Sequence, residues 1–212
     1  MEQFILVLEL IGTCAFAISG AVVSIKKHLD IFGVVFCGLI TALGGGVIRD
    51  ILLSNLPPAM FCNYIYAFFA VGTTILTFLF ALIAKNSFES KAIYIDRVNN
   101  IFDAIGLGVF TIVGINTALS MGFTDNPFFV IFLGMTTGCG GGILRDVLVR
   151  EVPFILSEKI YAIASILGGI LYYQMVAVWQ VDVFLSVICG IAFIVVLRIT
   201  SSVFRWDLPK AY

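Results

Sequence analysis

Two copies of one short motif carry the residues best suited to chemistry in this sequence. The first runs from Gly44 to Asp50 and the second from Gly140 to Asp146, and both read Gly-Gly-Gly-x-x-Arg-Asp. An arginine can pair with a carboxylate or hold an anionic solute, and a carboxylate can attract a cation. Neither copy has the Lys-Ser/Thr of a phosphate-binding loop, and no Ser–His constellation accompanies it. The motif therefore indicates handling of ions or small solutes rather than catalysis.

The composition places both motifs in a membrane. Of 212 residues, 61% are hydrophobic and 12% are charged, and the mean hydropathy is +1.12. Soluble domains have roughly 45–50% apolar and about 25% charged residues. The net charge of −1 implies no basic surface for nucleic acid, and the five cysteines form no metal-ligand cluster. We expect an integral, all-α membrane protein that is not an enzyme and holds no metal or other cofactor.

Seven apolar segments are long enough to cross a bilayer, which requires ~20 mostly apolar residues. They cover residues 4–24, 31–54, 62–84, 99–118, 127–149, 159–176 and 182–199. Lys and Arg mark the cytoplasmic side of a membrane protein. All 12 of them except Arg49 and Arg145 fall in the odd-numbered connections or at the C-terminal end. The predicted topology therefore has the N-terminus outside and the C-terminus in the cytosol.

The two motifs belong to a longer internal repeat. Residues Glu9–Gly20 match Asp103–Gly114, and Tyr66–Ala67 recurs at Tyr161–Ala162. Each repeat contains three helices, an odd number, so the two halves have opposite topology and form an inverted repeat. The predicted organisation is a first repeat at residues 1–84, a cytoplasmic linker at 85–98, the inverted repeat at 99–176, and the seventh helix with the C-terminal tail at 177–212.

The glycines of each motif lie near the middle of the second and fifth predicted helices. Each glycine inside a helix costs ~1 kcal/mol relative to alanine, so we predict that both helices are kinked or broken there. Freed carbonyls, with nearby threonine hydroxyls, would then line a water-filled path for a cation. The residues concerned are Thr41, Gly44, Gly45 and Gly46 in the first copy, and Thr136, Thr137, Gly140, Gly141 and Gly142 in the second. The alternatives are that the glycines allow close helix packing and that the hydroxyls bond back to helix carbonyls.

Each motif arginine has a candidate partner at its own depth in the membrane. From the ~1.5 Å rise per helical residue, Arg49 and Glu9 lie toward the outer surface, and Arg145 and Asp103 toward the inner one. We therefore predict one outer and one inner ion pair. Charges inside a membrane usually face the bundle interior or a wet cavity, which favours an ion or solute path. The alternative is that the pairs only hold the helices together.

The motif aspartates need partners of their own. Asp50 and Asp146 each follow a motif arginine directly in the chain. Adjacent residues on a helix do not face each other, so we do not expect them to pair with those arginines. We predict instead that they pair with another helix or cap a broken helical segment.

The doubled motif, the inverted three-plus-three repeat and the seventh helix make the chain similar to the trimeric intracellular cation channel (TRIC) family. The match is best with its prokaryotic branch, formerly an uncharacterised bacterial membrane family, and it covers nearly the whole chain. The resemblance implies a homotrimer in a bacterial inner membrane, with an hourglass pore in each protomer bounded by the kinked second and fifth helices. It also implies permeation by monovalent cations, chiefly potassium and secondarily sodium, and contact with membrane lipids.

A second function is compatible with the same residues. Some bacterial relatives resemble glycine uptake proteins, and inverted repeats with broken helices are the usual build of secondary transporters. A motif arginine could hold the carboxylate of such a substrate. The sequence therefore predicts a monovalent cation channel, with a transporter of a small solute such as glycine as the alternative.

Overall fold

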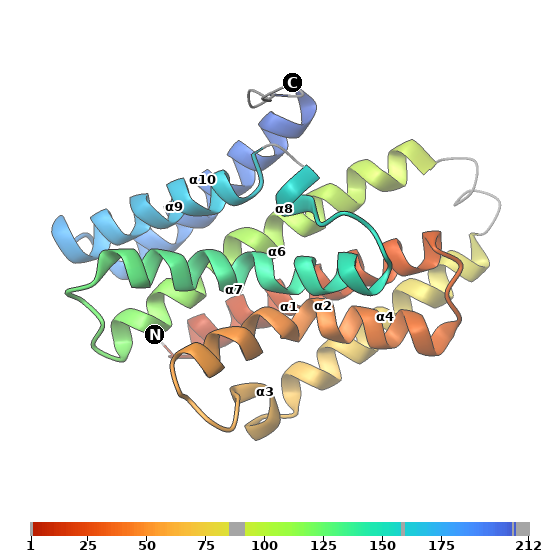
Figure 1. The fold of residues 1–212 in the computed structure, drawn as a ribbon, viewed down its shortest axis with the longest axis horizontal. Helices are drawn as coiled ribbons and strands as arrows, with labels where there is room; N and C mark the ends of the chain where they lie inside the picture. Colours follow the sequence, from red (N-terminus) through yellow and green to blue (C-terminus); the bar gives the residue numbers. More distant parts are fainter. Residues whose placement is uncertain (1, 85–91, 158–159, 205, 207–212) are drawn as a thin grey trace.

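The computed structural model describes residues 2–84, 92–157, 160–204 and 206, and all regular structure within them is helical (Figure 1). The helices are α1 (Glu2–Lys26), α2 (Ile31–Leu52), α3 (Ala59–Cys62), α4 (Ile65–Ile83), α6 (Ala92–Ser120), α7 (Pro127–Leu148), α8 (Phe154–Ser157), α9 (Ala162–Tyr173) and α10 (Val183–Val203). A π-helical turn, Gln174–Val178, continues α9. The predicted all-α class is confirmed.

Among the described residues, six helices are long and apolar enough to cross a membrane. The sixth predicted span corresponds to Ala162–Val178, which is apolar but shorter. The third predicted span begins late, at Ile65, because Ala59–Cys62 forms a short helix of its own. Part of the predicted linker is helical, since α6 begins at Ala92, and residues 85–91 of that linker lie outside the described residues.

The two repeats pack around a central helix pair. Helices α2 and α7 lie side by side and run in opposite directions, as the colours of Figure 1 show. Helices α1 and α4 pack against α2, and α6 and α9 pack in the same way against α7. The arrangement equates α1, α2 and α4 with α6, α7 and α9. Helix α10 packs on α6 and α9 and belongs to neither repeat.

Both motif helices continue through their glycines without interruption. The α-helical hydrogen bonding of α2 runs from Ile31 to Leu52 and that of α7 from Pro127 to Leu148. The predicted local break at Gly44–Gly46 and Gly140–Gly142 is therefore wrong, and helix backbone groups are not freed there. A kink at either triplet remains a prediction.

Close packing explains the glycines instead. A Cβ atom on Gly45 would collide with the carbonyl oxygen of Thr137, and one on Gly141 would collide with that of Thr41. The hydrogen that stands in place of each Cβ points at the facing carbonyl, a contact that recurs between closely packed helices. A Cβ on Gly140 would also lie 3.2 Å from the Gly45 Cα. The intrinsic cost of glycine in a helix is thus offset by the approach of two backbones.

Alanine at the crossing should destabilise the fold. We expect Gly45→Ala or Gly141→Ala to lower the unfolding free energy by about 1–3 kcal/mol or more, because a backbone carbonyl cannot move aside as a side chain can. Gly72→Ala is the control, since nothing lies within 4 Å of a Cβ at that position. Thermal unfolding in detergent measures the effect. Equal midpoints for Gly45→Ala and Gly72→Ala would contradict the close-packing explanation.

Candidate functional site

The first-motif cluster consists of Glu9, Arg49, Asp50 and Tyr66, from helices α1, α2 and α4. Arg49 Nη1 lies 3.6 Å from Glu9 Oε1, and Arg49 Nε lies 2.8 Å from Asp50 Oδ1. The Tyr66 hydroxyl donates to Glu9 Oε2 at 2.5 Å. Arg49 and Asp50 are buried, while the Glu9 side chain is 17% exposed. The structure therefore brings Arg49 and Glu9 together, as their depth predicts.

The second-motif cluster consists of Ser19, Asp103, Arg145 and Asp146, from helices α1, α6 and α7. Arg145 Nη1 donates to Asp103 Oδ1 at 2.7 Å and to Ser19 Oγ at 2.6 Å. Arg145 Nε lies 2.8 Å from Asp146 Oδ1. The side chains of Arg145 and Asp103 are 0% exposed. The second predicted pair is thus also present, in a drier environment than the first.

The motif aspartates pair with their neighbouring arginines, contrary to our prediction, but they also bind the start of another helix, as we predicted. Each arginine bends along its helix so that Nε, rather than the terminal nitrogens, reaches the adjacent carboxylate. The second oxygen of each aspartate accepts a backbone N–H at 2.8 Å, Asp50 from Ala59 and Asp146 from Phe154. These N–H groups begin the short helices α3 and α8, where helical N–H groups lack internal partners. Each aspartate therefore joins its arginine to the segment that follows the motif.

The three predicted threonines bond back to their own helices. Thr41 donates to the Cys37 carbonyl at 2.6 Å, and Thr137 and Thr136 donate to the Leu133 carbonyl at 2.6 and 3.1 Å. Thr41 and Thr137 are fully buried. Their hydroxyls are therefore satisfied within the helix, as in the alternative interpretation, and their role as ion ligands remains a prediction.

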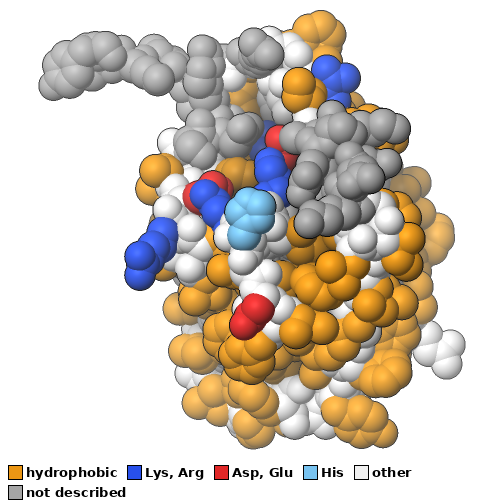
Figure 2. Space-filling view, turned by 90° about the vertical axis from the view of Figure 1, so that its right-hand side faces the viewer, with side chains coloured by type: hydrophobic (Ala, Val, Ile, Leu, Met, Phe, Trp, Pro, Cys, Tyr) orange, Lys and Arg blue, Asp and Glu red, His pale blue; other side chains and the backbone are white. Residues whose placement is uncertain are grey.

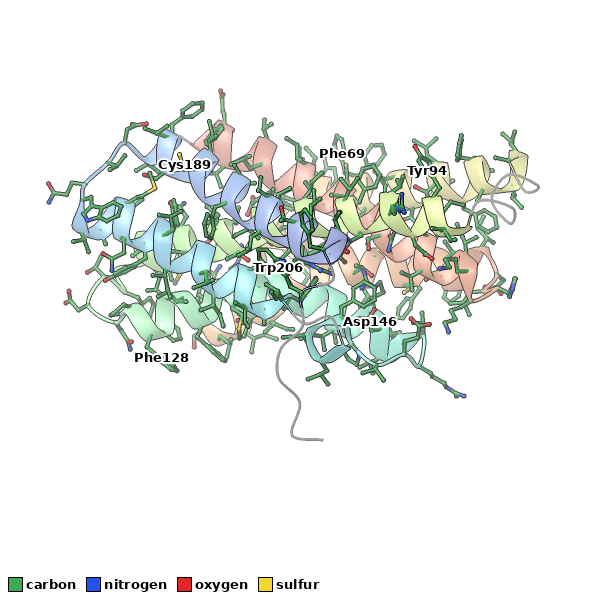
Figure 3. The ribbon with its side chains drawn as sticks, turned by 90° about the horizontal axis from the view of Figure 1, so that it is seen from above. Phe69, Tyr94, Phe128, Asp146, Cys189 and Trp206 are labelled. Carbon is green, nitrogen blue, oxygen red and sulfur yellow. The ribbon has the colours of Figure 1, made fainter. Side chains whose placement is uncertain are left out.

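The two clusters differ in their access to open space. The first-motif cluster lines a small cavity of about 40 Å³, together with Gly46 and Phe110. A larger cavity of about 810 Å³ lies beyond the second-motif cluster and is bounded by Phe154 and Arg198. The Arg145 guanidinium stacks 4.7 Å from the centre of the Phe154 ring, and that of Arg198 stacks 4.9 Å from the centre of the Tyr161 ring. Figure 3 shows Asp146 beside α8, the short helix that carries Phe154.

Each cluster carries an excess of negative charge. One arginine faces two carboxylates in both, Glu9 and Asp50 in the first and Asp103 and Asp146 in the second. An excess carboxylate in a region of low dielectric constant attracts cations more strongly than it would in water. Beside the second-motif cluster, the buried Arg198 on the Tyr161 ring adds a positive charge, so the excess is clearest at the first-motif cluster. The pair of clusters therefore places two cation-attracting centres on either side of the glycine crossing.

Sequence reasoning missed two tyrosines. Tyr66 and Tyr161 are equivalent in the repeat, and the recurrence of Tyr-Ala was the signal that could have identified them. Tyr66 bonds to Glu9, whereas Tyr161 hydroxyl and Asp103 Oδ2 have no hydrogen-bond partner within the described part of the chain. Aspartate is one methylene shorter than glutamate, so Asp103 bonds to Arg145 and Ser19 but leaves the equivalent tyrosine unbonded.

Removing charge should affect the clusters unequally. We expect Asp103→Asn to lower the unfolding free energy by about 3–5 kcal/mol, because it removes one of the two carboxylate charges that balance the fully buried Arg145. Glu9→Gln should cost about 1 kcal/mol or less, because that pair is longer and partly exposed to solvent. Thermal unfolding of both variants under identical detergent conditions compares them. A larger loss for Glu9→Gln would show that burial does not set the cost.

The comparisons with known proteins agree on one family. The family model described as "Glycine transporter" matches residues 6–82 and 100–177, which are the two repeats. The UPF0126 inner membrane protein YadS of Escherichia coli K12 is 36% identical over 95% of this chain and 92% of that protein. The UPF0126 membrane protein YvgT of Bacillus subtilis is 35% identical over 96% of this chain and 94% of that protein.

Solved structures of the same family match over nearly their full length. A prokaryotic TRIC channel crystallised in 0.5 M KCl is 36% identical, with a TM-score of 0.86 over 98% of this chain and 100% of that chain. The TRIC orthologue from Rhodobacter sphaeroides is 32% identical, with a TM-score of 0.86 over 96% of this chain and 100% of that chain. The chain therefore belongs to the prokaryotic branch of the TRIC family, whose sequence model carries the description of a glycine transporter.

Proposed function

We propose that this protein is a monovalent cation channel, chiefly permeable to potassium and secondarily to sodium. It works as a homotrimer in a bacterial inner membrane, with one pore in each protomer. The observation that carries this proposal is the pair of clusters with excess carboxylate on either side of the α2–α7 crossing. Family membership supports it, because solved relatives are described as TRIC cation channels.

The arginines limit how tightly a cation is held. Conduction requires sites that attract an ion but release it readily. In each cluster one carboxylate charge is balanced by the arginine, and hydrogen bonds hold the carboxylates in place. A passing potassium ion would therefore meet a fixed, moderate negative potential rather than a chelating site.

The described conformation is closed at the second motif. Asp103 and Arg145 are fully buried, and Phe154 and Arg198 stand between them and the large cavity. We infer that conduction requires α8 to move away from Arg145. The hydrogen bond from the Phe154 N–H to Asp146 would tie that movement to the motif itself.

The proposed orientation in the membrane places the large cavity on the cytoplasmic side. Lys26, Lys27 and Arg97 line the large cavity, and Figure 2 shows basic side chains gathered at this end of the molecule, near the single histidine, His28. Basic residues mark the cytoplasmic side. The large cavity would then open toward the cytosol, the N-terminus would lie outside, and lipid would contact the apolar flanks.

One observation favours the transporter alternative. Arg145 Nη2 has no hydrogen-bond partner within the described part of the chain. A guanidinium nitrogen of this kind can bind the carboxylate of a small amino acid, and the family model is described as a glycine transporter. Glycine is therefore the substrate to test against potassium.

Purified protein in planar bilayers separates the two functions. We expect stepwise single-channel currents that reverse at the potassium equilibrium potential, because the clusters favour cations over anions. Saturable uptake of labelled glycine by proteoliposomes is measured in parallel. Glycine uptake without unitary currents would overturn the channel proposal in favour of the transporter.

Neutralising one carboxylate tests the electrostatic argument. We expect Glu9→Gln to reduce potassium conductance at low ionic strength, because it cancels the excess charge of the first-motif cluster. The reduction should shrink as salt is raised, since the Debye length falls from ~30 Å at 0.01 M to ~3 Å at 1 M. Single-channel conductance as a function of KCl concentration measures it. Asp125 is exposed and lines neither the small nor the large cavity, so Asp125→Asn offers a control at which a smaller change is expected. Parallel conductance curves for wild type and Glu9→Gln would contradict the mechanism.

A further inference from the structure

Four buried polar atoms beside the second motif have no hydrogen-bond partner within the described part of the chain. They are Arg145 Nη2, Asp103 Oδ2, the Tyr161 hydroxyl and the side-chain oxygen of Asn99. None of these four residues is more than 6% exposed. A buried polar group without a partner costs free energy, and ordered water usually satisfies such groups. The four atoms therefore call for a ligand if they share one space.

The space that they share lies beside Gly142 of α7. A Cβ atom on Gly142 would lie 3.2 Å from the Tyr161 hydroxyl and 3.8 Å from Arg145 Nη2, and no third neighbouring atom of the described residues lies within 4 Å of it. Asp103 holds the same guanidinium through its other oxygen, Oδ1, at 2.7 Å from Nη1. Asn99 precedes Asp103 by one turn of α6, so the two side chains lie on one face of that helix.

The inverted repeat supplies a measure of this space. Gly46 stands at the position of Gly142 in the first motif, and it lines the cavity of about 40 Å³. A water molecule needs a cavity of only ~10–15 Å³. In the first repeat the Tyr66 hydroxyl donates directly to Glu9. Asp103 is one methylene shorter than Glu9, so the equivalent direct bond is replaced by a gap large enough for a small ligand.

We propose that this space is a binding site for an ordered water molecule that joins Tyr161, Arg145 and Asp103. The atoms around it are of both kinds, since Arg145 Nη2 only donates hydrogen bonds, Asp103 Oδ2 only accepts them, and the tyrosine hydroxyl does either. Water can accept from the guanidinium and donate to the carboxylate at the same time. It therefore replaces the methylene that distinguishes the two repeats.

The charges around the site disfavour an ion as its occupant. A cation would face the Arg145 guanidinium and, across the Tyr161 ring, that of Arg198, which stacks 4.9 Å from the ring centre. An anion would face the carboxylate of Asp103. A neutral ligand with both donors and acceptors avoids both conflicts, and this holds whether the protein conducts cations or carries a solute.

Asn99 gives this water a route to solvent. Its side-chain oxygen lies one helical turn from Asp103, and Asn99 also lines the cavity of about 810 Å³. A water molecule that leaves the site can therefore be accepted by Asn99 before it enters the cavity. The site is thus buried, yet it exchanges its water with the solvent of the large cavity.

X-ray radiolysis of the full-length protein tests the site. Hydroxyl radicals that form from a bound water oxidise the ring beside it, and mass spectrometry measures the rate for each tyrosine. We expect Tyr161 to be oxidised several-fold faster than Tyr172. The latter is the matched control, because it is also fully buried but its hydroxyl donates to Asn116 at 3.1 Å.

Two substitutions separate this water from that of the large cavity. In Asp103→Glu the carboxylate should reach Tyr161 directly, so we expect Tyr161 oxidation to fall several-fold while that of Phe154, which lines the large cavity, stays the same. If that variant folds poorly, Gly142→Ala fills the space with a methyl group and should have the same effect. Gly46→Ala is its control in the other repeat and should leave Tyr161 oxidation unchanged.

Three results would overturn the proposal. The first is equal oxidation of Tyr161 and Tyr172 in the unmodified protein. The second is Tyr161 oxidation that neither Asp103→Glu nor Gly142→Ala reduces, which would trace the radicals to the large cavity. The third is Tyr161 oxidation that falls when KCl replaces N-methylglucamine chloride, which would assign the space to a potassium ion. None of these results depends on whether the protein conducts, so the proposed channel is judged separately from its currents.

Discussion

The reciprocal contact between glycines of α2 and carbonyls of α7 is the constraint on which the rest of the structure depends. Gly45 faces the Thr137 carbonyl, and Gly141 faces that of Thr41. Any side chain at either glycine would push the two helices apart. Because the motif arginine and aspartate follow each triplet by a fixed spacing, this crossing also sets where both charged clusters lie. The glycines therefore determine how closely α2 and α7 approach each other, and both helices stay continuous.

The inverted repeat turns one motif into two charged centres. Each arginine must find carboxylates, because an unpaired charge inside a membrane is costly. In both copies the arginine pairs with two carboxylates. One belongs to the next residue in the chain, and the other, Glu9 or Asp103, comes from the first helix of a repeat. Since the repeats are antiparallel, the two centres lie on opposite sides of the crossing. The same arrangement of one arginine and two carboxylates therefore occurs twice across the protomer, in opposite orientation.

Much of this arrangement follows from the sequence, and the exceptions have physical causes. Helix positions and the two long-range ion pairs could be predicted, because apolar length and depth in a bilayer are properties of the chain. From the sequence, a broken helix at the glycines could not be distinguished from close packing. The choice depends on which backbone faces Gly45 in the fold. The Arg–Asp pairs do not follow from the directions of neighbouring Cβ atoms on a helix, because they depend on the long Arg49 and Arg145 side chains bending until Nε meets the adjacent carboxylate. The Tyr161 hydroxyl has no hydrogen-bond partner among the described residues, because the Asp103 side chain is one methylene shorter than that of Glu9.

Helix α10, which belongs to neither repeat, makes an otherwise symmetric protomer unequal at its two ends. Helix α10 supplies Arg198, which covers Tyr161 and bounds the large cavity, and no equivalent helix covers Tyr66 within the described residues. The second-motif cluster is consequently sealed, while the first-motif cluster opens on a small cavity. The same helix covers α6 and α9 in the second repeat, whereas an apolar cavity remains along α1 and α4 in the first. One element without a repeat partner thus accounts for both asymmetries. The buried second-motif cluster and the uncovered apolar side of α1 arise together, because two symmetric repeats share a single extra helix.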